Sequence, residues 1–136
     1  MFEASGGAVN FIAVLVPALM GAFYGFKCLF NTDNAIAEWG IGAGSEFMVK
    51  LTGTYCGTQG VMYIILLVTS LSGSWALFAF GTIQAALFLF FGYTTVKGKW
   101  AEVEGVNATN EGIIVPAILL IFHLYIMFAM GGIIYG

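Results

Sequence analysis

Residues 51–96, LTGTYCGTQGVMYIILLVTSLSGSWALFAFGTIQAALFLFFGYTTV, form an unbroken run without a charged side chain. A single α-helix of this length would extend about 69 Å at about 1.5 Å per residue, roughly twice the hydrocarbon thickness of a membrane. The run therefore predicts two membrane-spanning helices, near residues 51–70 and 75–95. The break lies at residues 70–74, SLSGS, a cluster of turn formers in which a serine can also cap the next helix.

Two further apolar runs flank this stretch. The first, residues 8–30, has Pro17 in its middle, so we expect a kink where the proline leaves a carbonyl without its helical donor. The last, residues 113–135, has Pro116 in its first turn, where the missing amide hydrogen does least harm. The sequence thus predicts an all-α integral membrane protein, a four-helix bundle that forms a single domain over residues 1–136.

The composition agrees with a membrane protein and excludes other classes. Hydrophobic residues make up 60% of the chain and charged residues 8%, whereas an ordinary soluble domain has roughly 25% charged residues. The chain has no arginine and only four basic residues, so we expect no nucleic-acid partner. The two cysteines, Cys28 and Cys56, lack the spacing of metal ligands and are predicted to be buried as small apolar residues.

Two polar segments, residues 31–50 and 96–112, are predicted to be loops on one side of the membrane. The first should carry a short surface helix near residues 34–39. All four lysines lie on this side: Lys27, Lys50, Lys97 and Lys99. Because lysines concentrate on the cytoplasmic side of membrane proteins, the loops should face the cytoplasm, or the matrix or stroma of an organelle. Both termini are then predicted on the non-cytoplasmic side.

Polar and small residues within the spans are the candidates for function, because a polar group in lipid is costly unless it is partnered. Polar residues recur at helical spacing on one face of the second span: Thr52, Cys56, Gln59 and Tyr63. Glycines stand at helix-packing spacing in the first two spans: Gly21, Gly25, Gly53, Gly57 and Gly60. We expect these glycines to allow close packing within the bundle. The alternative is a groove that accepts a lipid tail or a quinone.

His123 is the only histidine, and its position along the last span places it near the bilayer midplane. Gln84 reaches nearly the same depth in the third span. We expect a neutral imidazole held by a polar partner, with Gln84 as the candidate and Gln59 or Tyr63 close in height. The alternative is a cofactor site in which His123 and Gln84 contact a quinone or a tetrapyrrole, with His123 as axial ligand in chlorophyll or haem. No second histidine is available for a bis-histidine haem.

The sequence contains no recognisable catalytic set. It has no Ser/His/Asp arrangement, no HExxH motif and no phosphate-binding loop, and we expect no metal site. Every Asp and Glu falls in a predicted loop or near a terminus, whereas ion-coupled transporters bury at least one ionisable group. We therefore do not expect transport by this chain alone, and the lack of a catalytic set makes enzymatic activity the less favoured interpretation.

Residues 24–67, YGFKCLFNTDNAIAEWGIGAGSEFMVKLTGTYCGTQGVMYIILL, resemble the small four-helix membrane proteins of the DoxX-like group. In that group a polar loop leads into a helix that opens with a basic residue, with a glycine three positions later and further small residues at helical spacing. Lys50, Gly53, Gly57 and Gly60 match this pattern, although the group usually has arginine in place of Lys50. The resemblance implies a compact bundle, in some cases an accessory subunit of a quinone-linked oxidoreductase, and it supplies no catalytic residue.

These features predict a structural or accessory subunit that assembles with or stabilises a larger membrane complex, such as an energy-transducing redox or photosynthetic complex. Other membrane subunits and bound lipids are the expected partners. Two alternatives stay open. One is a pigment- or haem-binding subunit that uses His123, and the other is a small quinone- or lipid-binding membrane oxidoreductase of the DoxX-like type.

Overall fold

The computed structural model of the protein describes residues 5–136, and this part of the chain contains helices and loops but no strand. The helices, with η for a short 3-10 helix, are α1 (Ala8–Phe30), α2 (Thr32–Trp39), η1 (Ala43–Ser45), α3 (Glu46–Val68), α4 (Trp75–Val96), η2 (Lys99–Glu102), α5 (Glu111–Ala129) and α6 (Gly131–Ile134). Within residues 5–136, four helices are long and apolar enough to cross a membrane: α1, α3, α4 and α5. The predicted all-α, multi-pass membrane fold is therefore confirmed.

Two helix boundaries differ from the prediction. α3 begins at Glu46 rather than near residue 51, because an acidic residue favours a helix N-terminus and Glu46 also pairs with Lys50 at 2.5 Å one turn later. α5 ends at Ala129, and Met130 separates it from the short α6, which opens with two glycines. The segment 31–50 is thus less of a loop than predicted, since it holds α2 and the first turn of α3.

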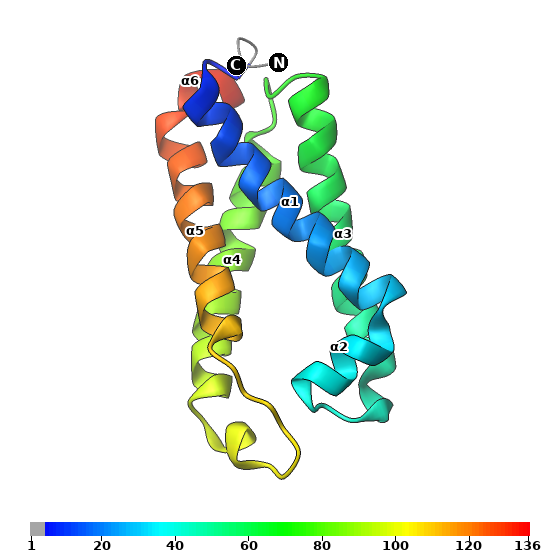
Figure 1. The fold of residues 1–136 in the computed structure, drawn as a ribbon. Coiled ribbons are helices and arrows are strands. Elements are labelled where there is room, and N and C mark those ends of the chain that lie inside the picture. Colours follow the sequence, from blue (N-terminus) through cyan, green and yellow to red (C-terminus); the bar gives the residue numbers. More distant parts are fainter. Residues whose placement is uncertain (1–4) are drawn as a thin grey trace.

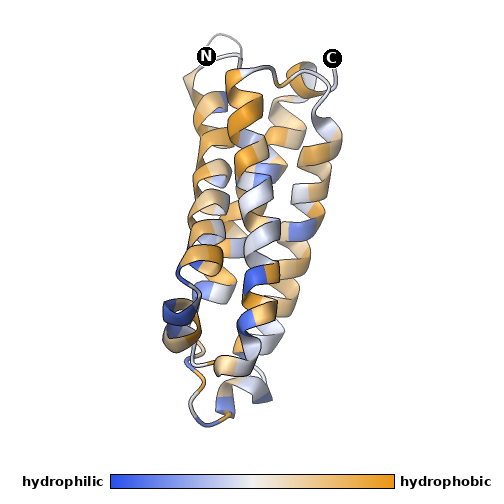
Figure 2. Ribbon diagram, turned by 90° about the vertical axis from the view of Figure 1, so that its right-hand side faces the viewer, coloured by the Kyte–Doolittle hydropathy of each residue, from blue (hydrophilic) through white to orange (hydrophobic). Residues whose placement is uncertain are grey.

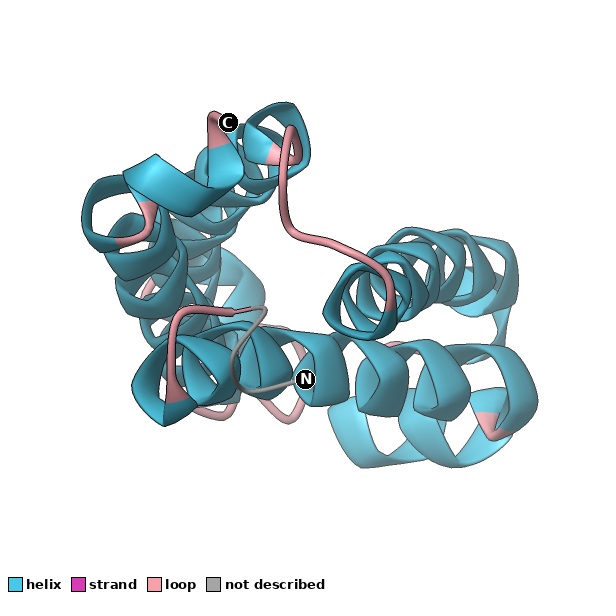
Figure 3. Ribbon diagram, turned by 90° about the horizontal axis from the view of Figure 1, so that it is seen from above, coloured by secondary structure: helices cyan, strands magenta, loops and turns pink. Residues whose placement is uncertain are grey.

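The long helices form two pairs (Figure 1). α1 crosses α3 in close contact, α4 runs alongside α5, and the pairs are joined mainly where α1 contacts α5. The start of α1, the C-terminus and the turn between α3 and α4 lie at one end, called here the terminal end, whereas α2 and the loop between α4 and α5 lie at the other, the loop end (Figure 1). Figure 3 shows the bundle from the terminal end, with the turn after α3 bridging the two pairs. Apolar residues cover most of the long helices, and hydrophilic ones gather towards the loop end (Figure 2).

Glycines bring α1 and α3 into backbone contact. A Cβ added to Gly25 would lie 2.4 Å from the Cα of Gly57, and one added to Gly60 would lie 2.4 Å from the backbone nitrogen of Ala22. Atoms this close cannot coexist, so only glycine fits at these positions without separating the helices. The structure places all five glycines singled out in the sequence at this contact: Gly21, Gly25, Gly53, Gly57 and Gly60.

The main buried core lies in the terminal half of the bundle. All four long helices contribute to it, through residues such as Val14, Leu67, Phe78 and Ile126. A smaller cluster at the loop end packs α2 against α1 and α3, and its buried members are Cys28, Ala35, Ile36 and Val49. Neither α4 nor α5 contributes a buried residue to this second cluster. The two helix pairs are therefore held together by a shared core near the terminal end only.

Candidate functional site

A cavity of about 280 Å³ lies where the two helix pairs separate. Its wall takes residues from all four long helices and is mostly apolar, with Met20, Ala85 and Val115 among its members. The inner end is formed by Tyr63 and His123, which border the terminal core. Residues of α2 and of the loop before α5 line the outer end, so the cavity extends from mid-bundle to the loop end.

A chain of hydrogen bonds closes the inner end of the cavity. The Gln59 side-chain amide donates to the Tyr63 hydroxyl at 2.8 Å, and that hydroxyl lies 2.7 Å from His123 Nε2. His123 Nδ1 lies 2.7 Å from the Leu119 carbonyl oxygen, which can only accept. Nδ1 therefore carries the proton, and Nε2 accepts the hydroxyl hydrogen of Tyr63. This Gln59–Tyr63–His123 chain satisfies a neutral imidazole completely, with His123 only 2% exposed.

Gly81 of α4 makes room for the Gln59–Tyr63–His123 hydrogen bonds. It was not among the glycines predicted to be important. A Cβ at Gly81 would lie 2.3 Å from both His123 Nε2 and the Tyr63 hydroxyl oxygen, and 2.6 Å from the Gln59 amide nitrogen. The Tyr63 ring also stacks on Phe78 one turn earlier in α4, with ring centroids 4.9 Å apart. The only sequence signal was a glycine in an apolar span one turn from Gln84.

Gln84 is not the partner of His123, in contrast to the expectation from equal depth. Gln84 follows Gly81 by three residues, which displaces it about 4.5 Å along α4 towards the loop end. It lines the cavity, and within residues 5–136 its side chain makes no hydrogen bond to His123. Tyr63 of α3 is the hydrogen-bond partner of His123 instead, because Gly81 of α4 leaves room for the Tyr63 hydroxyl beside the imidazole.

The four polar residues of the second span do not all belong to the site. Cys56, Gln59 and Tyr63 line the cavity. Thr52 is exposed and donates to the Met48 carbonyl of its own helix at 2.9 Å. A threonine at the outer end of a span can satisfy its hydroxyl in this way without a second helix. Cys28 is buried under α2, as expected, whereas Cys56 is only half-buried.

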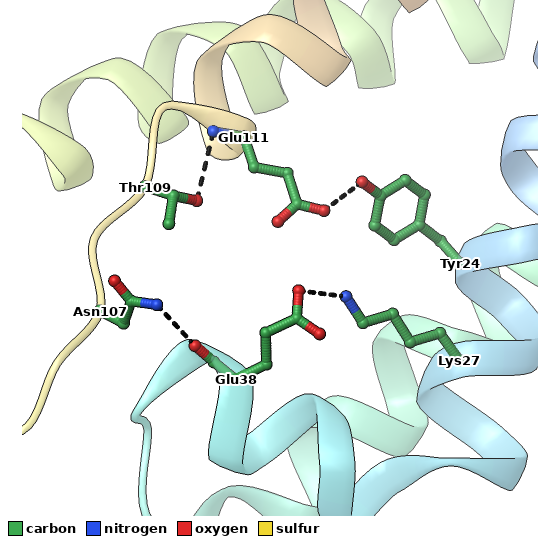
Figure 4. A network of polar contacts seen from close by, with 6 residues as sticks. All are labelled: Tyr24, Lys27, Glu38, Asn107, Thr109 and Glu111. Carbon is green, nitrogen blue, oxygen red and sulfur yellow. Dashed lines mark hydrogen bonds and ion pairs between the residues drawn. The ribbon is translucent and has the colours of Figure 1, made fainter.

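Polar contacts between α1, α2 and the segment before α5 surround the outer end of the cavity (Figure 4). The Tyr24 hydroxyl donates to the Glu111 carboxylate. Asn107 donates twice to the end of α2, through its side-chain amide to the Glu38 carbonyl oxygen at 2.9 Å and through its backbone nitrogen to the Trp39 carbonyl oxygen at 3.1 Å. Sequence spacing could not reveal these pairs, because Tyr24 and Glu111 are 87 positions apart.

Lys27 fixes α2 beside this network. Its ammonium group lies 2.9 Å from a Glu38 carboxylate oxygen and 4.9 Å from the centroid of the Trp39 ring. The side chain of Lys27 is 11% exposed, so the pair is better shielded from solvent than the exposed Glu46–Lys50 pair. Lys27 therefore joins the end of α1 to α2 by charge and by cation–π contact.

The polar groups at the inner end of the cavity are joined by hydrogen bonds between neutral side chains. No group of three or more His, Cys, Asp and Glu side chains in residues 5–136 is arranged to hold a metal ion. Both nitrogens of His123 are already engaged, so an axial bond to a tetrapyrrole metal would require Tyr63 to give up its acceptor. The residues present thus do not fit a chlorophyll or haem ligand at His123.

No family model, curated protein or solved structure matches this chain. The resemblance to the DoxX-like group stays a prediction, and any functional assignment rests on the cavity and on the side chains that line it.

Proposed function

We propose that this membrane protein binds a small membrane-soluble molecule in the cavity between its helix pairs, one with an apolar body and a neutral hydrogen-bonding group. An isoprenoid quinone or a neutral lipid has this chemistry. The observation that carries the proposal is the pairing of a mainly apolar wall with two glutamine amides, Gln59 and Gln84, that line the same cavity. Such a wall with few polar groups is typical of small-molecule sites.

The two amides have hydrogen-bonding capacity to offer a ligand. Gln59 uses one amide hydrogen on Tyr63, and within residues 5–136 neither its carbonyl oxygen nor any polar atom of Gln84 has a hydrogen-bond partner. Both glutamines are half-buried and line the cavity, so these groups are accessible from it. A ligand carbonyl or hydroxyl at this depth could hydrogen-bond to them, at a net gain of about 0.5–1.5 kcal/mol per bond.

The preferred ligand group is neutral because nothing at the inner end can balance a charge. Within residues 5–136, Glu111 is the only carboxylate that lines the cavity, and it lies at the outer end, where it accepts a hydrogen bond from Tyr24. A charged group moved into an apolar interior without a partner loses far more solvation than it regains. A phospholipid could therefore insert only its acyl chain.

Quinone binding can be measured through tryptophan fluorescence. Trp39 and Trp100 line the cavity, whereas Trp75 lies at the terminal end. Titrating protein in lipid nanodiscs with a short-chain benzoquinone should give saturable quenching, and Gln59→Leu or Gln84→Leu should each raise Kd about three- to tenfold, as expected for one lost hydrogen bond. Thr58→Val, a change outside the cavity on α3, is the matched control.

The outcome also distinguishes the ligand classes. Competition of the quenching by a neutral diacylglycerol but not by other quinones would identify a lipid as the ligand. Quenching that rises linearly without saturation, and equally in all variants, would contradict a binding site in the cavity.

The loop end is proposed to face the cytoplasm, or the matrix or stroma in an organelle. This orientation follows from the lysines, which lie in the last turn of α1, near the start of α3, at the end of α4 and in η2, all at or near the loop end. In a variant without native cysteines, Glu104→Cys should react with an impermeant maleimide only from the cytoplasmic side, and Ser72→Cys only from the opposite side. Labelling of both positions from one side would contradict the orientation.

The role of an accessory subunit in a larger membrane complex stays a prediction. It is compatible with ligand binding, because a ligand-binding bundle can itself be one subunit of such a complex. Membrane proteins that co-purify with the chain after mild solubilisation are the measurement that checks it.

A further inference from the structure

We propose that residues 103–110, called here the loop strap, form a gate over the outer end of the cavity, held shut by the hydrogen bonds that Asn107 donates to α2 and by the Tyr24–Glu111 bond where the strap joins α5. The strap connects η2 to α5 and has no regular secondary structure. The inference concerns access to the binding site and rests on the proposed function for its biological meaning. The gate itself can be tested without a ligand.

The fold gives the two helix pairs the form of arms joined at the terminal end. The shared core lies there, and Tyr63 and His123 mark its limit towards the cavity. A hydrogen bond of 2.9 Å from the Tyr125 hydroxyl to Asn10 adds a further link between α5 and α1 in the terminal half. Beyond the cavity the arms no longer share buried apolar contacts, because the loop-end cluster belongs to α1, α2 and α3 alone.

Hydrogen bonds, rather than a packed core, bridge the arms at the loop end. They are the Tyr24–Glu111 contact and the two bonds that Asn107 donates to the carbonyl oxygens of Glu38 and Trp39. Figure 4 shows the Tyr24 hydroxyl facing the Glu111 carboxylate, and the Asn107 amide facing the backbone carbonyl oxygen of Glu38. Such bonds exchange with water at small net cost, so the loop end is the place where the bundle opens most easily.

The strap sits on α2 in a shape that only glycine allows. Gly40, which ends α2, has φ +63°, and a Cβ there would lie 1.9 Å from the Gly105 carbonyl oxygen and 2.9 Å from the Asn107 nitrogen. Gly105 itself has φ +87°, and a Cβ added to it would meet no atom of residues 5–136 within 4 Å. Gly40 thus leaves room for the strap backbone, whereas no side chain packs against the outward side of Gly105.

α2 is the fixed side of the gate and the strap is the moving side. The buried cluster under α2 and the Lys27–Glu38 pair tie α2 to α1 and α3. The strap, in contrast, consists mostly of exposed residues, with only Val106 and Ala108 half-buried. Release of Asn107 and Tyr24 should therefore lift the strap and leave α2 in place.

Cys56 provides a native reporter of cavity access, because it lines the cavity and is half-buried. In a Cys28→Ala background it is the only thiol, and its reaction with a small cationic methanethiosulfonate should be slow while the strap is seated. Asn107→Ala and Tyr24→Phe should each accelerate the reaction about three- to tenfold, and the double variant more than either. Asn34→Ala, which removes an exposed hydrogen bond within the α2 region, is the matched control and should leave the rate unchanged.

The possible outcomes separate the gate from the binding site. The gate would be overturned if Cys56 were labelled at the same rate in the folded Asn107→Ala and Tyr24→Phe variants as in their parent protein. It would also be overturned if Cys56 of the parent protein, with its strap unaltered, were labelled as fast without urea as in urea. Circular dichroism identifies variants that fail to fold. If the double variant does not fold, the labelling rates of the two single variants decide the question. Faster labelling without saturable quinone or lipid binding would support the gate and contradict the proposed function. Saturable binding with unchanged labelling would support the proposed function and contradict the gate.

Discussion

Replacing Gly25 by alanine should destabilise the bundle strongly, whereas the same change at Gly57, directly opposite, should have little effect. The two positions form one contact, but their Cβ directions differ. A Cβ on Gly25 would lie 2.4 Å from the Cα of Gly57, while one on Gly57 would lie 3.4 Å from the Cα of Gly25, an ordinary van der Waals distance. The first change forces two helix backbones apart, and overpacking of this kind costs about 1–3 kcal/mol.

The measurement is thermal unfolding of the detergent-solubilised protein followed by circular dichroism. Gly132→Ala serves as a control for glycine replacement in general, because no atom of residues 5–136 lies within 4 Å of the added Cβ. We expect Gly25→Ala to lower Tm clearly, and Gly57→Ala and Gly132→Ala to stay close to the unaltered protein. Equal effects at Gly25 and Gly57 would mean that α1 and α3 do not pack as the structure describes.

Tyr63→Phe should destabilise the protein through the polar groups that it leaves behind. Without the hydroxyl, His123 Nε2 and one amide hydrogen of Gln59 lose their partner, at a cost of about 1–3 kcal/mol. His123→Leu should also be costly, because the Tyr63 hydroxyl then has no acceptor. Tyr55→Phe on the same helix is the matched control, since Tyr55 is exposed.

The double variant Tyr63→Phe/His123→Leu gives the sharper test of the Tyr63–His123 bond. It removes both sides of the bond at once, so its destabilisation should be smaller than the sum of the single effects. Hydrogen bonds between membrane helices typically couple by about 0.6 kcal/mol and at most about 1.7 kcal/mol, so the difference should fall in this range. Strict additivity in urea or thermal unfolding would show that the two side chains do not interact.

Three features of the fold could be predicted because they depend on the free energy of local segments in lipid. The uncharged run 51–96 is too long for one span, and the serines and glycine at residues 70–74 place the turn, which the structure has between Val68 and Trp75. The surface helix near residues 34–39 was also recognisable, and the structure has it as α2. The start of α3 was misplaced because hydropathy counts Glu46 against a helix, although its charge favours a helix N-terminus.

The sequence by itself thus determined the number, order and approximate limits of the membrane helices, because the cost of burying charge in lipid is a property of each segment. Only the tertiary structure decided which side chains meet. His123 pairs with Tyr63 rather than Gln84, and Gly81 makes that possible, because the rotation of α3, α4 and α5 about their axes sets which groups face one another. The cavity and its strap have the same origin. They exist because the two helix pairs share a core near the termini and part towards the loops, a separation that depends on contacts between residues far apart in the chain.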